Sequence, residues 1–253
     1  MDLHIKDKVA LVTGGSRGLG RAICMGLAAE GAKVAVNYHS STTKAEQVVE
    51  EIKTKYKTEA IAVQADVSKS EQVRHMFEQA EETLGPLDIL VNNAGTWPTA
   101  YITDMSEEQW DTTVDINMKG PFLTCRRAVQ RWLETKKTGR IINISSQAAF
   151  YGSTTGHAHY AASKAGLVTF TKSLAREVAA NGICVNAVSP GFMATDMSRD
   201  EFRKNKKQYL KRIPLGRIAE PEEIANMVVF LASDRAGYIT GATMDVNGGM
   251  LMR

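Results

Sequence analysis

The chain has 253 residues, of which 43% are hydrophobic and 23% charged, and its formal net charge is +3. This composition is that of an ordinary globular protein, and the charge is too small to indicate a nucleic-acid-binding surface. No apolar run approaches the roughly 18 residues of a membrane-spanning helix, and three scattered cysteines predict neither a disulfide framework nor a metal site. The polar first residues do not resemble a signal peptide, so we expect a cytoplasmic protein away from membranes.

Short apolar runs, each stopped by glycine or polar residues, recur along the chain. They are continuous rather than alternating, as expected for strands buried on both faces of a parallel sheet. Longer stretches between them, such as "TKAEQVVEEIKTKY" (43–56), place apolar residues three and four positions apart and predict helices. The strand candidates are residues 9–15, 33–38, 60–67, 87–95, 139–146, 182–191 and 243–249.

This alternation predicts the α/β fold class. We expect a single dinucleotide-binding domain over residues 1–253, with a Rossmann-type, doubly wound, seven-stranded parallel sheet and helices on both faces. No linker, repeat or low-complexity segment divides the chain.

The first strand runs into "TGGSRGLG" (13–20), which precedes a predicted helix. Glycines at 14, 18 and 20 allow a tight turn and bring a helix N-terminus close to a ligand, where backbone amides and the helix dipole favour a pyrophosphate. The spacing differs from the usual Gly-x-Gly-x-x-Gly pattern. Its place in the first strand-to-helix unit nevertheless favours nucleotide binding.

Tyr160 and Lys164 stand four residues apart in "YAASK", so they lie on one face of a helix with only small residues between them. A tyrosine with a pKa near ~10 is a poor acid–base catalyst at neutral pH, and a neighbouring cation lowers that pKa. The pair therefore predicts proton transfer.

Four motifs, "TGGSRGLG", "NNAG" (92–95), "YAASK" (160–164) and "SPG" (189–191), come in an order that resembles the short-chain dehydrogenase/reductase family. The C-terminal part is most similar to the 3-oxoacyl-(acyl-carrier-protein) reductases. The resemblance implies NADPH-dependent reduction of a ketone to a secondary alcohol. The favoured substrate is a 3-oxoacyl thioester of fatty acid biosynthesis, which would be reduced to the 3-hydroxyacyl product. The alternatives are a dehydrogenase of a sugar, steroid or other secondary alcohol, and a non-catalytic NADP-binding regulator.

The resemblance also implies the catalytic residues. Tyr160 protonates the carbonyl oxygen, and Lys164 contacts the nicotinamide ribose. Ser146 bonds the substrate oxygen, with its neighbour Ser145 as the alternative. Asn117 bends a helix and holds a water in a proton relay to Lys164.

The expected cofactor is NADP(H). No Asp or Glu occurs from Gly31 through Ala45, where an NAD site places an acid on the adenine ribose. Arg17 stands where NADP-preferring relatives carry a basic residue, and a guanidinium suits a phosphate. The expected cofactor-binding residues, in addition to Tyr160 and Lys164, are Gly14, Gly15, Ser16, Arg17, Gly18, Leu19, Gly20, Asn37, His39, Ser40, Asp66, Val67, Asn93, Ala94, Gly95, Pro190, Gly191, Met193 and Thr195.

Residues 198–212 carry seven Lys or Arg against two acids, inside the segment 192–215 where the family has a substrate lid. A basic lid suits an acyl-carrier protein or a coenzyme A thioester, and five basic residues between Arg126 and Lys137 could extend the patch. Relatives that bind a carrier protein commonly have arginine at the position of Asn181, and their loop corresponding to 96–105 is less bulky. The sequence therefore does not decide whether the acyl group is carried by an acyl-carrier protein. His157 and His159, two positions apart with no carboxylate cluster nearby, do not indicate a metal site, and His159 is expected to be a loop or pocket residue. By resemblance we expect a homotetramer.

Overall fold

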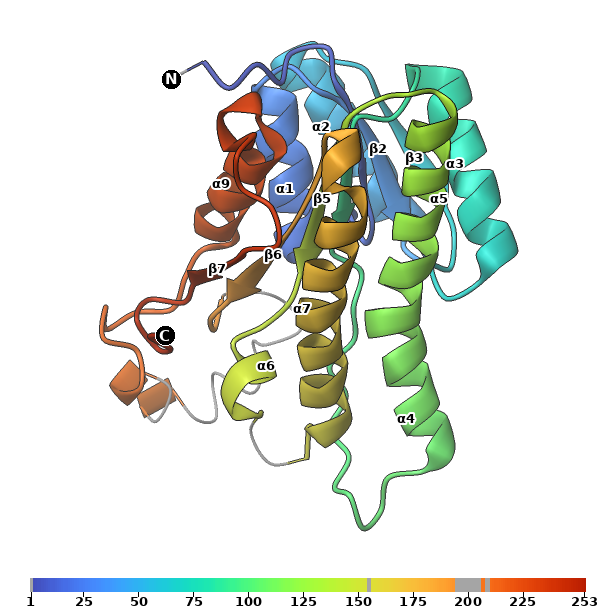
Figure 1. Ribbon diagram of the computed structural model, residues 1–253. Helices are drawn as coiled ribbons and strands as arrows, with labels where there is room; N and C mark the ends of the chain where they lie inside the picture. Colours follow the sequence, from blue (N-terminus) through green and yellow to red (C-terminus); the bar gives the residue numbers. More distant parts are fainter. Residues whose placement is uncertain (1, 154–155, 194–205, 208–209) are drawn as a thin grey trace.

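The computed structural model describes residues 2–153, 156–193, 206–207 and 210–253. Within these residues, seven strands form one parallel sheet in the order β3-β2-β1-β4-β5-β6-β7 (Figure 1). All seven predicted strands are confirmed, each at or inside its predicted range. Their bounds are β1 Val9–Val12, β2 Lys33–Tyr38, β3 Ala60–Gln64, β4 Ile89–Asn92, β5 Gly139–Ile144, β6 Ile183–Pro190 and β7 Thr243–Val246.

Alternate residues of each central strand enter one of two cores. In β1, Ala10 and Val12 pack with α1, α2 and α9, whereas Val9 and Leu11 pack with α3, α5 and α7. Both faces are therefore covered, which explains the continuous apolar runs. The helices are α1 Gly18–Ala29, α2 Thr42–Tyr56, α3 Ser70–Leu84, α4 Glu107–Val114, α5 Gly120–Glu134, α6 Ala148–Tyr151, α7 Ala158–Val178 and α9 Pro221–Ala232, with short helices η1 Asp115–Lys119, η2 Ala179–Asn181 and η3 Asp234–Ala236.

From β1, the chain builds the sheet outward in one direction through β2 and β3 and then in the other direction through β4 to β7. Chain connections leave such a point in opposite directions, so a crevice opens outside the carboxyl ends of the strands. The glycine loop follows β1 directly, and residues 93–97 follow β4 directly. The predicted phosphate-binding turn therefore lies at the carboxyl ends of the central strands, where ligands bind in this fold class.

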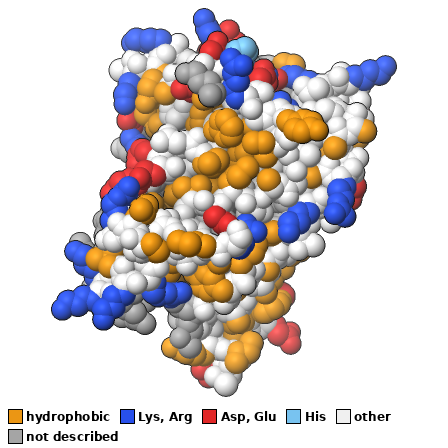
Figure 2. All heavy atoms as spheres, turned by 60° about the vertical axis from the view of Figure 1, so that its left-hand side comes forward, with side chains coloured by type: hydrophobic (Ala, Val, Ile, Leu, Met, Phe, Trp, Pro, Cys, Tyr) orange, Lys and Arg blue, Asp and Glu red, His pale blue; other side chains and the backbone are white. Residues whose placement is uncertain are grey.

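One face of the molecule, which carries α9 and β7, exposes apolar side chains. Figure 2 shows hydrophobic side chains gathering across the middle of this face. Leu215, Tyr238 and Met252 are among the exposed large hydrophobic residues near the C-terminal part of the chain. Among the strands that the structure describes, β7 has a neighbour on one side only, which leaves its other edge without a strand partner there. Among the described residues, no helix combines the length and apolar character needed to cross a membrane.

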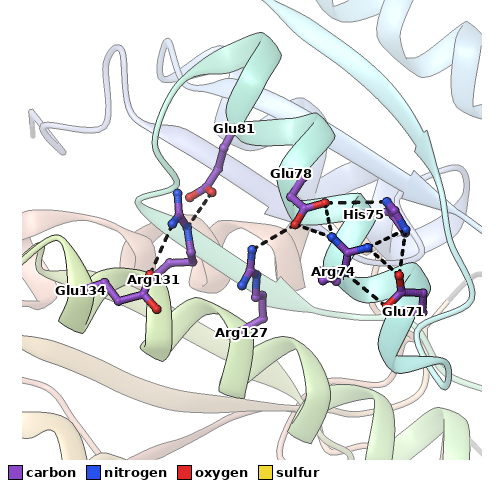
Figure 3. Close-up of polar contacts among 8 residues, drawn as sticks. All are labelled: Glu71, Arg74, His75, Glu78, Glu81, Arg127, Arg131 and Glu134. Carbon is purple, nitrogen blue, oxygen red and sulfur yellow. Dashed lines mark hydrogen bonds and ion pairs between the residues drawn. The ribbon is translucent and has the colours of Figure 1, made fainter.

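The helices α3 and α5 are joined by ion pairs. Arg131 Nε lies 3.0 Å from Glu81 Oε2, and Arg127 Nη2 lies 3.4 Å from Glu78 Oε1 (Figure 3). Lys137 Nζ pairs with Asp88 Oδ1 at 2.9 Å. Three of the five basic residues between Arg126 and Lys137 are thus neutralised locally. This finding corrects the expectation that they extend a basic patch for an anionic partner.

Candidate active site

One cavity of about 770 Å³ is lined by residues that follow the carboxyl ends of β1 to β6 and by the first turns of α7. The volume lies within the range of small-molecule and cofactor sites. Most of the residues that the sequence predicted separately face this space. They include the glycine loop, the end of β2, Asp66, residues 93–95, Ser146, Tyr160, Lys164 and residues 190–193.

Glycine is required at two places in the loop. Gly14 has a φ of +63°, and a Cβ on Gly20 would lie 2.1 Å from the Gly14 carbonyl oxygen. The side chain of Asn93 donates to the Thr13 and Gly14 carbonyl oxygens at 2.9 and 3.1 Å and holds the loop from below. The helix α1 begins at Gly18 without a side-chain cap on its first amides. These amides are suited to a pyrophosphate.

Of the two predicted cofactor-binding residues Gly15 and Asn37, only Asn37 lines the cavity. A Cβ on Gly15 would lie 2.9 Å from both Cys24 Sγ and Val36 Cγ1, so Gly15 packs into the core and does not line the cavity. The Asn37 side chain is buried, and its Oδ1 accepts from the Gly14 amide at 3.1 Å. Its Nδ2 donates to the Ala65 carbonyl at 3.1 Å. Asn37 therefore supports the loop, and it also lines the cavity.

The end of β2 leaves the adenosine side of the cavity without an acid. His39, Ser40 and Ser41 line it, and Arg17 is exposed at the N-cap of α1. Asp66 lies after β3 and accepts hydrogen bonds from the Ser68 amide and hydroxyl at 2.9 and 2.7 Å. Partial burial raises the pKa of Asp66, but the Ser68 hydrogen bonds outweigh it and the pKa is lowered overall. The carboxylate is therefore ionised at neutral pH and available as an acceptor.

Residues 93–95 join the glycine loop to the reaction centre. The amides of Asn93 and Ala94 both donate to Thr13 Oγ1 at 3.0 Å. A Cβ on Gly95 would lie 3.2 Å from Asn117 Oδ1 and 3.6 Å from Lys164 Nζ. The backbone at Gly95 therefore packs closely against both polar side chains. Val67, on the neighbouring loop, also lines the cavity.

Tyr160 and Lys164 lie on the first turns of α7 and both face the cavity. Lys164 is buried, and its Nζ donates to the Ile144 carbonyl at 2.8 Å and lies 5.8 Å from the centre of the Tyr160 ring. Burial lowers the pKa of Lys164 to about 8. Burial raises the pKa of Tyr160, with an opposing effect from the Ser146 hydrogen bond. The overall direction of the Tyr160 pKa is therefore opposite to the lowering that the sequence predicted.

The two adjacent serines point to different sides of β5. Ser145 is buried and donates to the Lys164 carbonyl oxygen at 3.1 Å. Ser146 bonds Tyr160 and accepts from the Ala148 amide at 3.1 Å. Geometry thus places Ser146 beside the phenol and gives Ser145 a role in holding α7 against the sheet.

Asn117 lies in a π-helical turn, η1, between α4 and α5. Its Oδ1 accepts from the Thr96 amide at 2.8 Å, and its Nδ2 donates to the Thr96 carbonyl at 2.9 Å and to Ser163 Oγ at 3.2 Å. Wider turns of this kind are frequent at functional sites. The predicted helix distortion is present, and the side chain links the segment after β4 to α7.

The end of β6 closes the cavity on the side opposite β1. Pro190, Gly191 and Met193 line it, and a Cβ on Gly191 would lie 2.7 Å from the Asn247 backbone. Thr195 and residues 194–205 of the expected lid lie outside the described residues.

Four further residues that the sequence analysis did not predict as site residues also line the cavity. They are Trp97, Gln147, Tyr151 and Arg212. The bulky loop 96–105 was the available signal for Trp97, but the orientation of the indole depends on contacts with His157 and Tyr160, which are distant in the sequence. His157 stacks on Trp97, His159 is fully buried in α7, and neither histidine lines the cavity, so the prediction of a loop or pocket position for His159 is wrong.

Comparisons with known proteins agree with this geometry. A family model described as enoyl-(acyl carrier protein) reductase matches residues 14–251. The chain is 48% identical over 246 residues to the 3-oxoacyl-(acyl-carrier-protein) reductase FabG of Staphylococcus epidermidis, covering 97% of this chain and 100% of that protein. The corresponding reductase of Synechocystis is 46% identical over 97% of each chain.

A solved structure gives the same result for the fold. The crystal structure of a dehydrogenase/reductase from Sinorhizobium meliloti superposes with a TM-score of 0.91 at 36% identity, covering 99% of this chain and 98% of that one. With matches that run over nearly the whole length and a Tyr160–Lys164 pair beside a glycine loop, the chain belongs to the short-chain dehydrogenase/reductase family.

Proposed function

We propose that this protein is an NADPH-dependent reductase that converts a 3-oxoacyl thioester to the 3-hydroxyacyl product. The observation that carries the proposal is the convergence of Ser146, Tyr160 and Lys164 with the glycine loop on one cavity. The names of the relatives, 3-oxoacyl-(acyl-carrier-protein) reductases at 42–48% identity, support the choice of substrate class.

The residues present fit NADPH. Gly20 packs closely against Gly14, which leaves room for a pyrophosphate beside the loop. The first turn of α1 has no side-chain cap, so its amides can bind that pyrophosphate. Arg17, His39 and Ser40 supply donors for a ribose 2′-phosphate, and no acid at the end of β2 repels it. Asp66 accepts from the adenine amino group. When bound, NADPH supplies the hydride for the carbonyl carbon.

Tyr160 supplies the proton. Its raised pKa keeps the phenol protonated at neutral pH, which is the form that a reduction needs. As hydride reaches the carbonyl carbon, negative charge develops on the oxygen, and the hydroxyls of Ser146 and Tyr160 both donate to it. The Tyr160 proton then moves to the oxygen and leaves an alcohol. The adjacent Lys164 stabilises the resulting phenolate.

Lys164 and Asn117 position the reacting groups. Lys164 would hold the nicotinamide ribose of a bound cofactor through the same ammonium that faces Tyr160. Asn117 fixes the segment after β4 through its two hydrogen bonds to Thr96, and a water held beside it connects Lys164 to solvent. This relay returns a proton to Tyr160 after each turnover.

The thioester carrier is anionic, either an acyl-carrier protein or coenzyme A. Support comes from four described, exposed basic residues in the segment that leads to the cavity-lining Arg212, namely Lys206, Lys207, Lys211 and Arg212 itself. Arg212 lines the cavity itself and lies 5.7 Å from the centre of the Tyr151 ring. A group of cations at the mouth of a cavity attracts a negatively charged carrier.

The protein acts in the cytoplasm as a homotetramer. The outer surfaces of α5 and α7 carry Phe122 and Phe170, whose ring centres are 6.5 Å apart, and Phe122 and Leu133 are exposed. The open edge of β7 and the apolar face of Figure 2 supply a second surface. Two separate self-complementary surfaces are what a closed tetramer requires.

A substrate panel tests the function. We expect NADPH oxidation with acetoacetyl-coenzyme A and acetoacetyl-carrier protein, little or none with NADH, and a much lower kcat/KM with glucose or steroid ketones. Alcohol oxidation with NADP⁺ as the dominant activity would favour the dehydrogenase alternative. Tight NADPH binding without turnover of any ketone would indicate the regulatory alternative.

A further inference from the structure

Trp97 lies directly beside the proposed proton donor. Its indole meets the Tyr160 ring edge-on, with ring centres 6.4 Å apart, and both side chains line the same cavity. A carbonyl whose oxygen contacts the Tyr160 hydroxyl therefore has one of its two carbon substituents on the side of Trp97.

The indole is held in place from behind. It stacks on the His157 ring with centres 4.4 Å apart and planes at 15°. His157 is buried at the start of α7, and its Nε2 lies 3.1 Å from Thr99 Oγ1. The loop that carries Trp97 and the loop before α7 are therefore bonded to each other on the outer side of the indole.

A glycine allows this approach of the two loops. The Ala100 amide donates to the Gly156 carbonyl at 2.8 Å. Gly156 has a φ of +81°, and a Cβ there would lie 2.9 Å from Thr99 Cγ2. A side chain at 156 would strain the turn and push the loops apart. Trp97 is thus part of a bonded assembly and cannot swing outward without breaking several contacts.

Another part of the cavity lining is cationic rather than purely aromatic. Arg212 and Tyr151 also line the cavity, and α6, which carries Tyr151, lies on the other side of the first turns of α7 from the segment after β4 in the view of Figure 1. An anionic thioester arm suits the cationic side, which leaves the alkyl arm of a 3-oxoacyl group to face the indole.

We infer that the Trp97–His157 stack is the end wall of the alkyl pocket and restricts this enzyme to 3-oxoacyl groups with a short tail. The inference rests on the proposed function and adds the substrate length to it. Each methylene of the acyl tail that fits an apolar pocket improves binding roughly fourfold. A methylene that would extend past a rigid wall does not fit and brings no such gain. Removing the indole opens room for several methylenes.

The experiment compares kcat/KM for acetoacetyl-coenzyme A and 3-oxooctanoyl-coenzyme A. Wild type should prefer the short substrate, and Trp97→Ala should shift the ratio toward the long one by at least about tenfold. His157→Ala should shift it in the same direction by less, because the indole stays but loses its support. Trp110→Ala removes an indole on α4 that does not line the cavity and should leave the ratio unchanged.

The outcomes separate the inference from the proposed function. An unchanged ratio in Trp97→Ala overturns the end wall while leaving the reductase intact. If Trp97→Ala does not fold, Trp97→Phe keeps a smaller ring in the stack and must show an intermediate shift. The same ratios are measured with ethyl 3-oxo esters. If the wild type reduces the esters but no thioester, the proposed substrate class is refuted. The ratio of long to short esters then still tests whether Trp97 limits the length of the tail.

Discussion

Burial of Lys164 should make the stability of the protein depend on pH in a defined window. The ammonium is enclosed and bonded to the Ile144 carbonyl, and burial lowers its pKa from 10.5 to about 8. Between these values the unfolded chain holds a proton that the folded chain has released, so the free energy of unfolding rises with pH. Below pH 8 the folded protein keeps a buried charge, which costs roughly 3 kcal/mol.

Lys164→Met removes this ionisation and keeps an unbranched side chain of similar length. The unfolding free energy of the wild type minus that of the variant should rise by about 2 to 3 kcal/mol between about pH 7 and about pH 10. The unpaired Ile144 carbonyl affects the variant equally at both values, so it cancels from this comparison. Urea unfolding, followed by circular dichroism at one protein concentration, measures the difference.

Lys172→Met is the matched control, because Lys172 lies exposed on the same helix. Its difference from the wild type should stay constant over this range. A difference for Lys164→Met that is flat with pH, or that falls as pH rises, would refute the assignment of a buried, weakly basic ammonium at this site.

Three further predictions address the cofactor, the serines and the assembly. Arg17→Ala should lower the ratio of kcat/KM for NADPH to that for NADH by roughly tenfold to a hundredfold, as for a lost charged hydrogen bond, and an unchanged ratio would show that Arg17 does not contact the phosphate. Ser146→Ala should lower kcat by about 10² to 10³, whereas Ser145→Ala should mainly lower stability by about 1 to 3 kcal/mol; the reverse pattern would exchange their roles. Light scattering at micromolar concentration should give the mass of a tetramer, and a monomer would contradict the two proposed interfaces.

The fold could be predicted from the sequence because its signals are local. Seven apolar runs and the intervening helical periodicity give the alternation of strands and helices, and this alternation permits few topologies. The glycine loop and the Tyr160–Lys164 pair were equally accessible, since each depends on residues within one turn or one loop.

The remaining parts of the site depend on which segments meet. Asn37 is predicted as a cofactor ligand at the end of a strand, but that position does not reveal that its buried side chain also accepts from the Gly14 amide. Lys164 lies one turn from Tyr160, yet burial and the Ile144 carbonyl decide its electrostatics. The stack of Trp97 on His157 joins residues far apart in the chain. No spacing rule carries that information.

The most direct test of the central account is the turnover of Tyr160→Phe with NADPH and an acetoacetyl thioester. The variant loses one oxygen and almost no volume, so its fold and its affinity for NADPH should remain those of the wild type. If the phenol supplies the proton, kcat falls by about 10² to 10⁴, the range of a lost general acid. Near-normal turnover in a folded variant that binds NADPH would contradict the account and leave Tyr160 as a packing residue.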